Sequence, residues 1–261
     1  MWIEKLARLG YGTKGIVYGI IGVLAVLAAF STGGKTTDTK GALHTIAAQP
    51  FGSFLIALVA IGMAGYALWR LVQAVVDLDN KGDDAEGIGS RLGYATSGII
   101  YGSLALTAAK LAFSFGGGSG GKSKEDWTAQ LLQQPFGPWL VGTVGSIIIG
   151  VGFYRLYQAY KIKFRKKLDL SQVSQEQENW LVTISRVGIA ARGIIFVMTG
   201  FFIIQAARQF DPNEVRGLDG ILQTLAQQPY GKLLLGLVAV GLVAYGAYMW
   251  VQALYRQINV S

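Results

Sequence analysis

Six stretches of this 261-residue sequence contain no Asp, Glu, Lys or Arg and are long enough, or nearly so, to cross a lipid bilayer. A membrane-spanning helix needs about 20 mostly apolar residues, and Lys or Arg at its ends can extend to the lipid phosphates. The fifth stretch reaches this length only when Val187–Arg192 is included. We therefore expect six transmembrane helices, at approximately 12–31, 51–76, 93–113, 136–160, 187–207 and 230–255.

The overall composition supports a membrane protein over a soluble one. Apolar residues make up 52% of the chain and charged residues 15%, whereas soluble domains carry about 25% charged residues. The 23 Lys and Arg exceed the 15 Asp and Glu, and the resulting net charge of +8 is typical of proteins that bind nucleic acid or an anionic membrane surface. Because the chain is so apolar, we expect anionic membrane lipids as partners and no nucleic acid.

Cysteine and histidine limit the chemistry most clearly. The chain has no Cys and one His, His44, so it lacks the residues for a disulfide scaffold, a thiolate metal site or a histidine cluster. No paired carboxylates fall within the expected spans, and no nucleophile has a base at a recognisable spacing. We therefore expect no metal, no cofactor and no enzymatic activity. His44 has the chemistry of a proton relay or axial ligand, but without a second ligand we expect it to be a surface residue.

The basic residues are distributed unequally between the two sides of the expected helices. The side with both termini and the connections 77–92 and 161–186 holds fifteen Lys and Arg, against eight on the other side. By the positive-inside rule, we expect both termini in the cytoplasm. Arg8, Arg91 and Arg186, just before each odd-numbered span, are expected to anchor the chain on that side.

One segment of the sequence occurs three times. The stretch Arg8–Gly19 returns as Arg91–Gly102, and a weaker copy is Arg186–Phe196. A second signature, Gln-Pro-Phe-Gly or Gln-Pro-Tyr-Gly, follows each copy and begins at Gln49, Gln134 and Gln228. Recurrence at a fixed period indicates a repeat architecture. Each repeat is then a helix, an outer loop and a helix, and the three repeats span 5–80, 88–165 and 183–258.

The segment before each Gln-Pro is also similar between repeats. Gly41–Ala48 and Gly220–Gln227 have the pattern of a short amphipathic helix lying at the outer interface. A proline disfavours helix in the residue before it and suits the first turn of a following helix. We therefore expect Pro50, Pro135 and Pro229 to turn the chain from lying on the membrane to crossing it.

An even number of helices in each repeat makes successive repeats parallel, with a symmetry axis along the membrane normal. Three such hairpins most simply close into a six-helix ring with approximate threefold symmetry, with an open arrangement as the alternative. Glycines at helical spacing, such as Gly15 with Gly19 and Gly98 with Gly102, are expected to let the helices approach closely. The predicted fold class is therefore an all-α polytopic membrane protein.

A polar set near the inner end of each second helix is the main candidate site. Aligning the pairs Gln73-Ala74, Gln158-Ala159 and Gln252-Ala253 superimposes Arg70 on Arg155, with Met249 in the third repeat. A threefold arrangement brings this candidate inner vestibule together from Arg70, Gln73, Arg155, Gln158 and Gln252. Ionisable residues in a span indicate function when a partner can be named; Asp77 is the candidate partner of Arg70, and lipid headgroups are candidates for both arginines. The alternatives are arginines that extend to lipid phosphates, a vestibule for an anionic solute, and docking of a partner protein.

This layout resembles the bacterial membrane family catalogued as domain of unknown function 1206 (DUF1206). The resemblance rests on the three Arg-[Leu/Val]-Gly copies, the three Gln-Pro-[Phe/Tyr]-Gly copies and the three Gln-Ala pairs, and it covers residues 5–256. It implies a six-helix integral protein of the bacterial inner (plasma) membrane, made of three two-helix units, and it transfers no catalytic or binding residue. The third repeat departs most, because Phe196-Val197 replaces Tyr-Gly.

A run of basic residues follows the fourth expected span, and we expect it to continue this helix into the cytoplasm. Its members are Lys161, Lys163, Arg165, Lys166 and Lys167. Such clusters attract anionic lipid with about 1 kcal/mol per charge near the surface. We expect this basic strip to bind anionic lipid, with a partner protein as the alternative.

Two classes of function fit these features. The first is a structural or assembly protein that binds lipid or another membrane protein, and the basic strip favours it. The second is a channel or carrier for a small solute or ion along a central pathway between the repeats, which the three repeated glutamines favour. The shortage of charge within the spans weighs slightly toward the first class.

Overall fold

The computed structural model describes residues 2–30, 36–77, 82–113 and 124–257. Residues 78–80 and 258, at the ends of two predicted repeats, lie outside these ranges. Within them the chain is helical, apart from turns and an isolated antiparallel bridge between Leu168 and Arg256. The long helices are α1 (Trp2–Ala29), α3 (Gly52–Val76), α4 (Ala85–Ala112), α6 (Gly137–Tyr160), α7 (Gln175–Gln209) and α9 (Gly231–Tyr255).

Short helices precede the second long helix of every repeat. They are α2 (Thr39–Ala47), α5 (Lys124–Leu132) and α8 (Leu218–Gln227). Two 3-10 helices lie in connections: η1 (Lys163–Lys167) follows α6, and η2 (Pro212–Glu214) follows α7. The predicted short helices before Pro50 and Pro229 are thus confirmed. Asp38 caps α2 by accepting a 3.0 Å hydrogen bond from the backbone of Gly41, and Ile221 and Leu222 of α8 are fully buried.

The Gln-Pro-[Phe/Tyr]-Gly signature forms the turn between the short and the long helix. The prediction that proline lies in the first turn of the long helix is wrong, because α3, α6 and α9 begin two residues later, at the glycine. Phe51 and Tyr230 adopt the left-handed conformation, with φ of 60° and 62°. A Cβ on Gly52 would overlap the carbonyl oxygen of Ala47, and Gly137 and Gly231 meet carbonyl groups in the same way. The chain reverses so tightly that only glycine fits.

Five of the described helices are long and apolar enough to cross a membrane, judged by length and composition: α1, α3, α6, α7 and α9. The prediction of six such spans is therefore only partly confirmed. The remaining long helix, α4, does not belong to this group, since Gly, Ser and Thr dilute its apolar residues.

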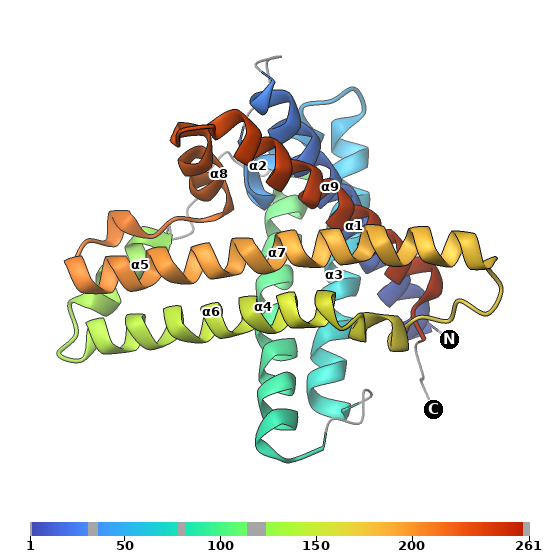
Figure 1. Cartoon of the computed structure of the whole chain (residues 1–261), viewed down its shortest axis with the longest axis horizontal. Helices are drawn as coiled ribbons and strands as arrows, with labels where there is room; N and C mark the ends of the chain where they lie inside the picture. The colour runs from blue at the N-terminus through green and yellow to red at the C-terminus, as the bar shows by residue number, and fades with distance from the viewer. Residues whose placement is uncertain (1, 31–35, 78–81, 114–123, 258–261) are drawn as a thin grey trace.

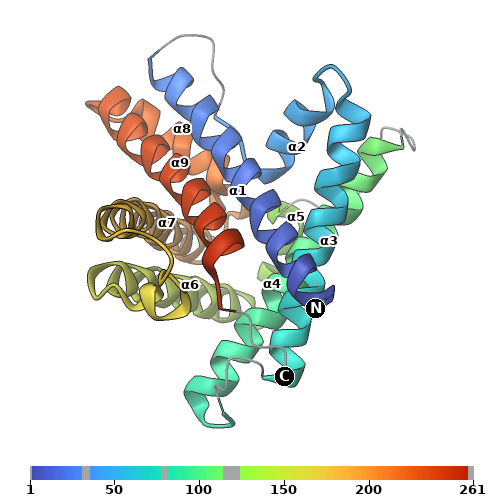
Figure 2. The ribbon, with the colours of Figure 1, turned by 90° about the vertical axis from the view of Figure 1, so that its right-hand side faces the viewer.

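The long helices pack as three pairs drawn from different repeats. The second helix of each repeat lies along the first helix of the next repeat, giving α3 with α4, α6 with α7, and α9 with α1. The three pairs point in different directions. The pair α6 and α7 runs almost at right angles to the pair α3 and α4, and the pair α1 and α9 is oblique to both (Figures 1 and 2). The predicted ring of six helices around a threefold axis is not confirmed.

Packing within a repeat is also unequal. The two helices of the first repeat, α1 and α3, are in contact, as are α7 and α9 of the third, but α4 and α6 have no comparable contact. The space around the glycine of the Arg-[Leu/Val]-Gly motif differs between the repeats in the same way. A Cβ at Gly10 would lie 2.7 Å from the Tyr66 backbone, and one at Gly188 would lie 2.5 Å from Tyr245 Cα, whereas one at Gly93 would meet nothing within 4 Å.

Candidate functional site

The repeated arginines before each first helix cap the end of the neighbouring helix in their pair. Arg8 Nη1 donates to the carbonyl oxygens of Ala253 and Leu254, at 2.8 and 2.6 Å. Arg91 donates to those of Ala74 and Val75, at 2.8 and 3.3 Å, and Arg186 donates to that of Ala159, at 3.2 Å. The last carbonyls of a helix lack partners and carry partial negative charge. In all three repeats the arginine therefore caps a helix end at the backbone carbonyl of the Ala in the Gln-Ala pair.

The glutamines of the predicted inner vestibule each accept a hydrogen bond from an arginine. Arg70 Nη1 donates to Gln73 Oε1 at 3.0 Å, and Arg155 Nη1 donates to Gln158 Oε1 at 3.1 Å. In the third repeat Met249 replaces the arginine, and Arg256 Nη1 donates to Gln252 Oε1 at 2.9 Å instead. A contact between an arginine and the repeated glutamine is thus present in all three repeats, although the third one uses a residue that the alignment did not identify. That the three glutamines share one vestibule stays a prediction. Among the described residues, none of the three glutamines hydrogen-bonds to another.

Arg70 is held without a carboxylate. Its Nε donates to the Tyr66 hydroxyl at 2.8 Å, and its guanidinium lies over the rings of Tyr66 and Tyr94, at 5.0 and 5.1 Å from their centroids. The expected partner Asp77 accepts a hydrogen bond from the Gly82 backbone instead. Aromatic faces and amide oxygens therefore replace an ion pair around this half-buried charge.

Buried donors without partners lie beside Arg70. The Tyr11 hydroxyl and Gln73 Nε2 are buried, and neither has a hydrogen-bond partner among the described residues. Tyr11 packs edge to face on Tyr66, with 5.3 Å between ring centroids. A buried polar group without a partner is costly and rare, so both donors indicate a place where an acceptor can bind.

A second cluster, which we name the tyrosine centre, surrounds Lys14 of α1. Only 9% of Lys14 is exposed, and its Nζ lies 4.7 to 5.9 Å from the ring centroids of four tyrosines. These tyrosines are Tyr18, Tyr66, Tyr101 and Tyr245. The ammonium donates to the Tyr66 hydroxyl at 3.2 Å, and this hydroxyl also accepts from Arg70, so it links the two clusters.

Arg192 of α7 contributes a second cation to the tyrosine centre. Its guanidinium lies over the rings of Phe196, Tyr18 and Tyr245, at 4.5, 5.0 and 5.9 Å from their centroids. Arg70, Arg192 and Arg155 are all near enough to repel the Lys14 ammonium electrostatically. This cluster was not predicted from the sequence. The alignment of the repeats does place two cations at one position, because Lys14 of the first repeat aligns with Arg192 of the third, and Ser97 stands there in the second.

The basic strip does not continue α6. The helix ends at Tyr160, Ile162 is left-handed with φ of 53°, and η1 folds back against the end of α9. Phe164 is buried and packs edge to face on Tyr248, with 5.7 Å between centroids. A hydrogen bond from Arg165 to Glu178, at 2.5 Å, raises the pKa of the guanidinium. The strip is therefore a folded turn in which Lys161, Lys163, Arg165 and Lys166 are exposed.

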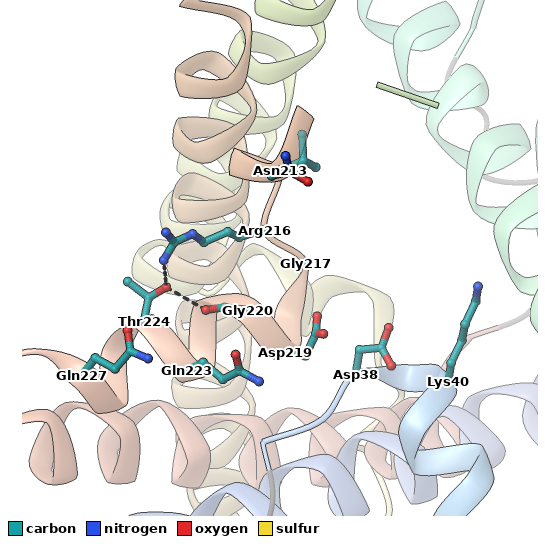
Figure 3. A pocket seen from close by; sticks show the side chains of 11 residues that line it. Asp38, Lys40, Asn213, Arg216, Gly217, Asp219, Gly220, Gln223, Thr224 and Gln227 are labelled. Atoms are coloured by element: carbon teal, nitrogen blue, oxygen red, sulfur yellow. Dashed lines mark hydrogen bonds between the residues drawn. The ribbon is translucent and has the colours of Figure 1, made fainter. Parts of the chain in front are cut away.

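Two other polar features lie on the outer segments. His44 is exposed on α2, and a hollow of about 550 Å³ is lined by polar residues of η2, α8 and the start of α2 (Figure 3). Arg216, which lines this hollow, lies 3.7 Å from Glu214 and donates to Thr224 at 2.5 Å. The charge of Arg216 is thus compensated, in contrast to that of Lys14 and Arg192.

The chain is an all-helical, repeat-built protein with several helices apolar enough to span a membrane. The model of the Domain of Unknown Function (DUF1206) family matches it three times, at residues 9–77, 92–161 and 187–256, and the chain belongs to this family. A protein of Bacillus subtilis (strain 168), described as Uncharacterized protein YxxB, is 38% identical over 258 residues, which cover 99% of this chain and 93% of that protein. No solved structure matches the chain.

Proposed function

We propose that the protein is a non-enzymatic carrier or channel for a small anion in the bacterial plasma membrane, with both termini in the cytoplasm. The apolar helices support the membrane location, and the excess of Lys and Arg on the side of the termini supports the orientation. The inner cluster, which we define as Arg70 with Tyr11, Tyr66 and Gln73, is then the place where the anion enters from the cytoplasm.

The main support for this proposal is positive charge on side chains of the long helices that no carboxylate neutralises in the described part of the chain. Lys14, Arg70, Arg155 and Arg192 have no carboxylate within ion-pair distance in the described part of the chain. Charged groups inside a membrane protein are costly and usually pair with one another or line a solute pathway. Four cations without carboxylates favour a ligand of negative charge over a purely structural role.

Flux measurements in liposomes test the proposal. Wild-type protein is expected to release chloride, nitrate or sulfate, and Arg70→Gln to lower the rate at least about tenfold, because a lost charged hydrogen bond corresponds to at least about 1.5 kcal/mol. Lys110→Gln is the control, because it removes an equal charge from an exposed position in the last turn of α4. It should leave the rate unchanged. Liposomes with wild-type protein that pass none of these anions would refute the proposal.

A second candidate function is lipid-dependent assembly through the basic strip. The favouring observation is that buried Phe164 and the antiparallel bridge of Leu168 to Arg256 hold the exposed basic residues in a fixed turn. Pre-ordering reduces the entropy lost when the strip binds lipid headgroups or a partner membrane protein.

The number of anionic lipids that copurify with the protein in mild detergent tests this candidate. The triple variant Lys161→Gln, Lys163→Gln and Lys166→Gln is expected to retain several-fold less phosphatidylglycerol, since each charge contributes about 1 kcal/mol. The control removes three exposed basic residues at the other ends of the helices, Lys110, Arg208 and Lys232. Equal lipid retention by both triple variants would show that the strip has no special affinity.

A further inference from the structure

The tyrosine centre contains more hydrogen-bond donors than acceptors. Within the described ranges, Arg192 makes no hydrogen bond with its five N–H groups, and its guanidinium lies over three aromatic rings. Lys14 donates one hydrogen bond, to Tyr66, and has two further N–H groups. Both cations therefore keep donors available for a ligand.

The tyrosine hydroxyls point to the same chemistry. Tyr18, Tyr101 and Tyr245 are 3%, 9% and 8% exposed, and their hydroxyls make no hydrogen bond to the described part of the chain. Each of the three rings also packs edge to face with another tyrosine of the centre. Unlike the Tyr11 hydroxyl, these three hydroxyls keep some accessible surface, so each can donate a hydrogen bond to a ligand that enters.

The charge and the aromatic surroundings of the site narrow the ligand class. Two uncompensated cations, Lys14 and Arg192, share the rings of Tyr18 and Tyr245. Between such rings an anion loses much of its water, and this cost is much greater for a multiply charged anion than for a small monovalent one. Positive ring edges and neutral hydroxyl donors suit a weakly hydrated monovalent anion.

We propose that Lys14, Arg192 and the hydroxyls of Tyr18, Tyr101 and Tyr245 form a buried binding site for a small monovalent anion such as chloride or nitrate. This inference rests on the proposed function, and it names the site within the apolar helices and the class of solute. The Tyr66 hydroxyl, which contacts both Arg70 and Lys14, connects this site to the inner cluster.

Thermal unfolding of the detergent-solubilised protein, titrated separately with chloride, nitrate and sulfate against a gluconate background, measures binding directly. A ligand that binds only the folded state raises the unfolding midpoint, and above the dissociation constant the rise grows with the logarithm of the ligand concentration. We expect this rise with chloride and nitrate and none with sulfate. The triple variant Tyr18→Phe, Tyr101→Phe, Tyr245→Phe keeps every ring, and it should weaken the apparent affinity at least about tenfold through the loss of three donors.

Charge variants complete the test. Lys14→Met and Arg192→Gln should abolish the rise of the midpoint with chloride and nitrate, while Lys110→Gln should keep it. The absence of this rise in the wild type, an unchanged affinity in the triple phenylalanine variant, or a rise with sulfate alone would each overturn the inference. Anion flux that is insensitive to these variants would leave the proposed function standing without this site, and saturable binding without flux would leave the site standing without transport.

Discussion

Gly188→Ala is expected to lower the free energy of unfolding by about 1–3 kcal/mol, since inserting a methyl group into a tight contact has this typical cost. A Cβ at this position would lie 2.5 Å from Tyr245 Cα and equally close to the backbone of α9, which cannot move aside as a side chain could. In a membrane, close backbone approach at small residues takes the place of the hydrophobic effect in holding helices together. We therefore also expect α7 and α9 to separate in part.

Two further variants give this prediction its internal control. Gly10→Ala should have an effect of similar size, because its Cβ would lie 2.5 Å from that of Tyr66 and 2.7 Å from the Tyr66 backbone. Gly93→Ala changes the same motif position in the second repeat, where nothing lies within 4 Å, and it should be neutral or stabilise α4 by up to about 1 kcal/mol through helix propensity. Circular dichroism melts in mild detergent measure all three variants. Equal effects at the three glycines would contradict the unequal packing of the repeats.

The contrast between these glycines shows how far the repeat pattern predicts the fold. The three sequence copies correctly indicated three helix–loop–helix units and the family, because each copy carries the same turn and capping residues. They did not indicate which helices would pair. Gly15, Gly98 and Gly193 all face the second helix of the preceding repeat in the cyclic order, a choice that depends on contacts between repeats and not on the spacing within one.

The sequence placed Arg70 and Gln73 three residues apart on one helix face, but it suggested Asp77 and not Gln73 as the partner of Arg70. Lys14 was harder to recognise. Its neighbours in the sequence, Thr13, Gly15 and Ile16, are small or apolar. The importance of Lys14 depends on tyrosines from α3, α4 and α9, which only the tertiary structure brings around it. The turn at Ile162 was also hidden, since a left-handed isoleucine has no local sequence signal and is held by the packing of Phe164.

Arg8→Gln is expected to destabilise the protein by about 1.5–3 kcal/mol, the usual contribution of hydrogen bonds from a charged donor. The substitution leaves the carbonyls of Ala253 and Leu254 without their charged partner at the end of α9, where the helix dipole favours a positive charge. Arg91→Gln should have a comparable effect at the end of α3, because Arg91 also contacts two carbonyls. Detergent unfolding of each purified variant measures the change.

The geometry further predicts an order among the three caps. Arg186 donates to a single carbonyl at 3.2 Å, so Arg186→Gln should have the smallest effect of the three. Lys5→Gln removes an equal charge from an exposed position on the first turns of α1 and should change stability by less than about 0.5 kcal/mol, as surface substitutions usually do. If the arginines acted only as cytoplasmic anchors that follow the positive-inside rule, Lys5 and the three arginines would give similar losses, and lysine would replace each arginine without cost. Because Arg91 uses two nitrogens of its forked guanidinium, Nε and Nη2, to reach two carbonyls at once, Arg91→Lys should restore only part of the stability that Arg91→Gln loses.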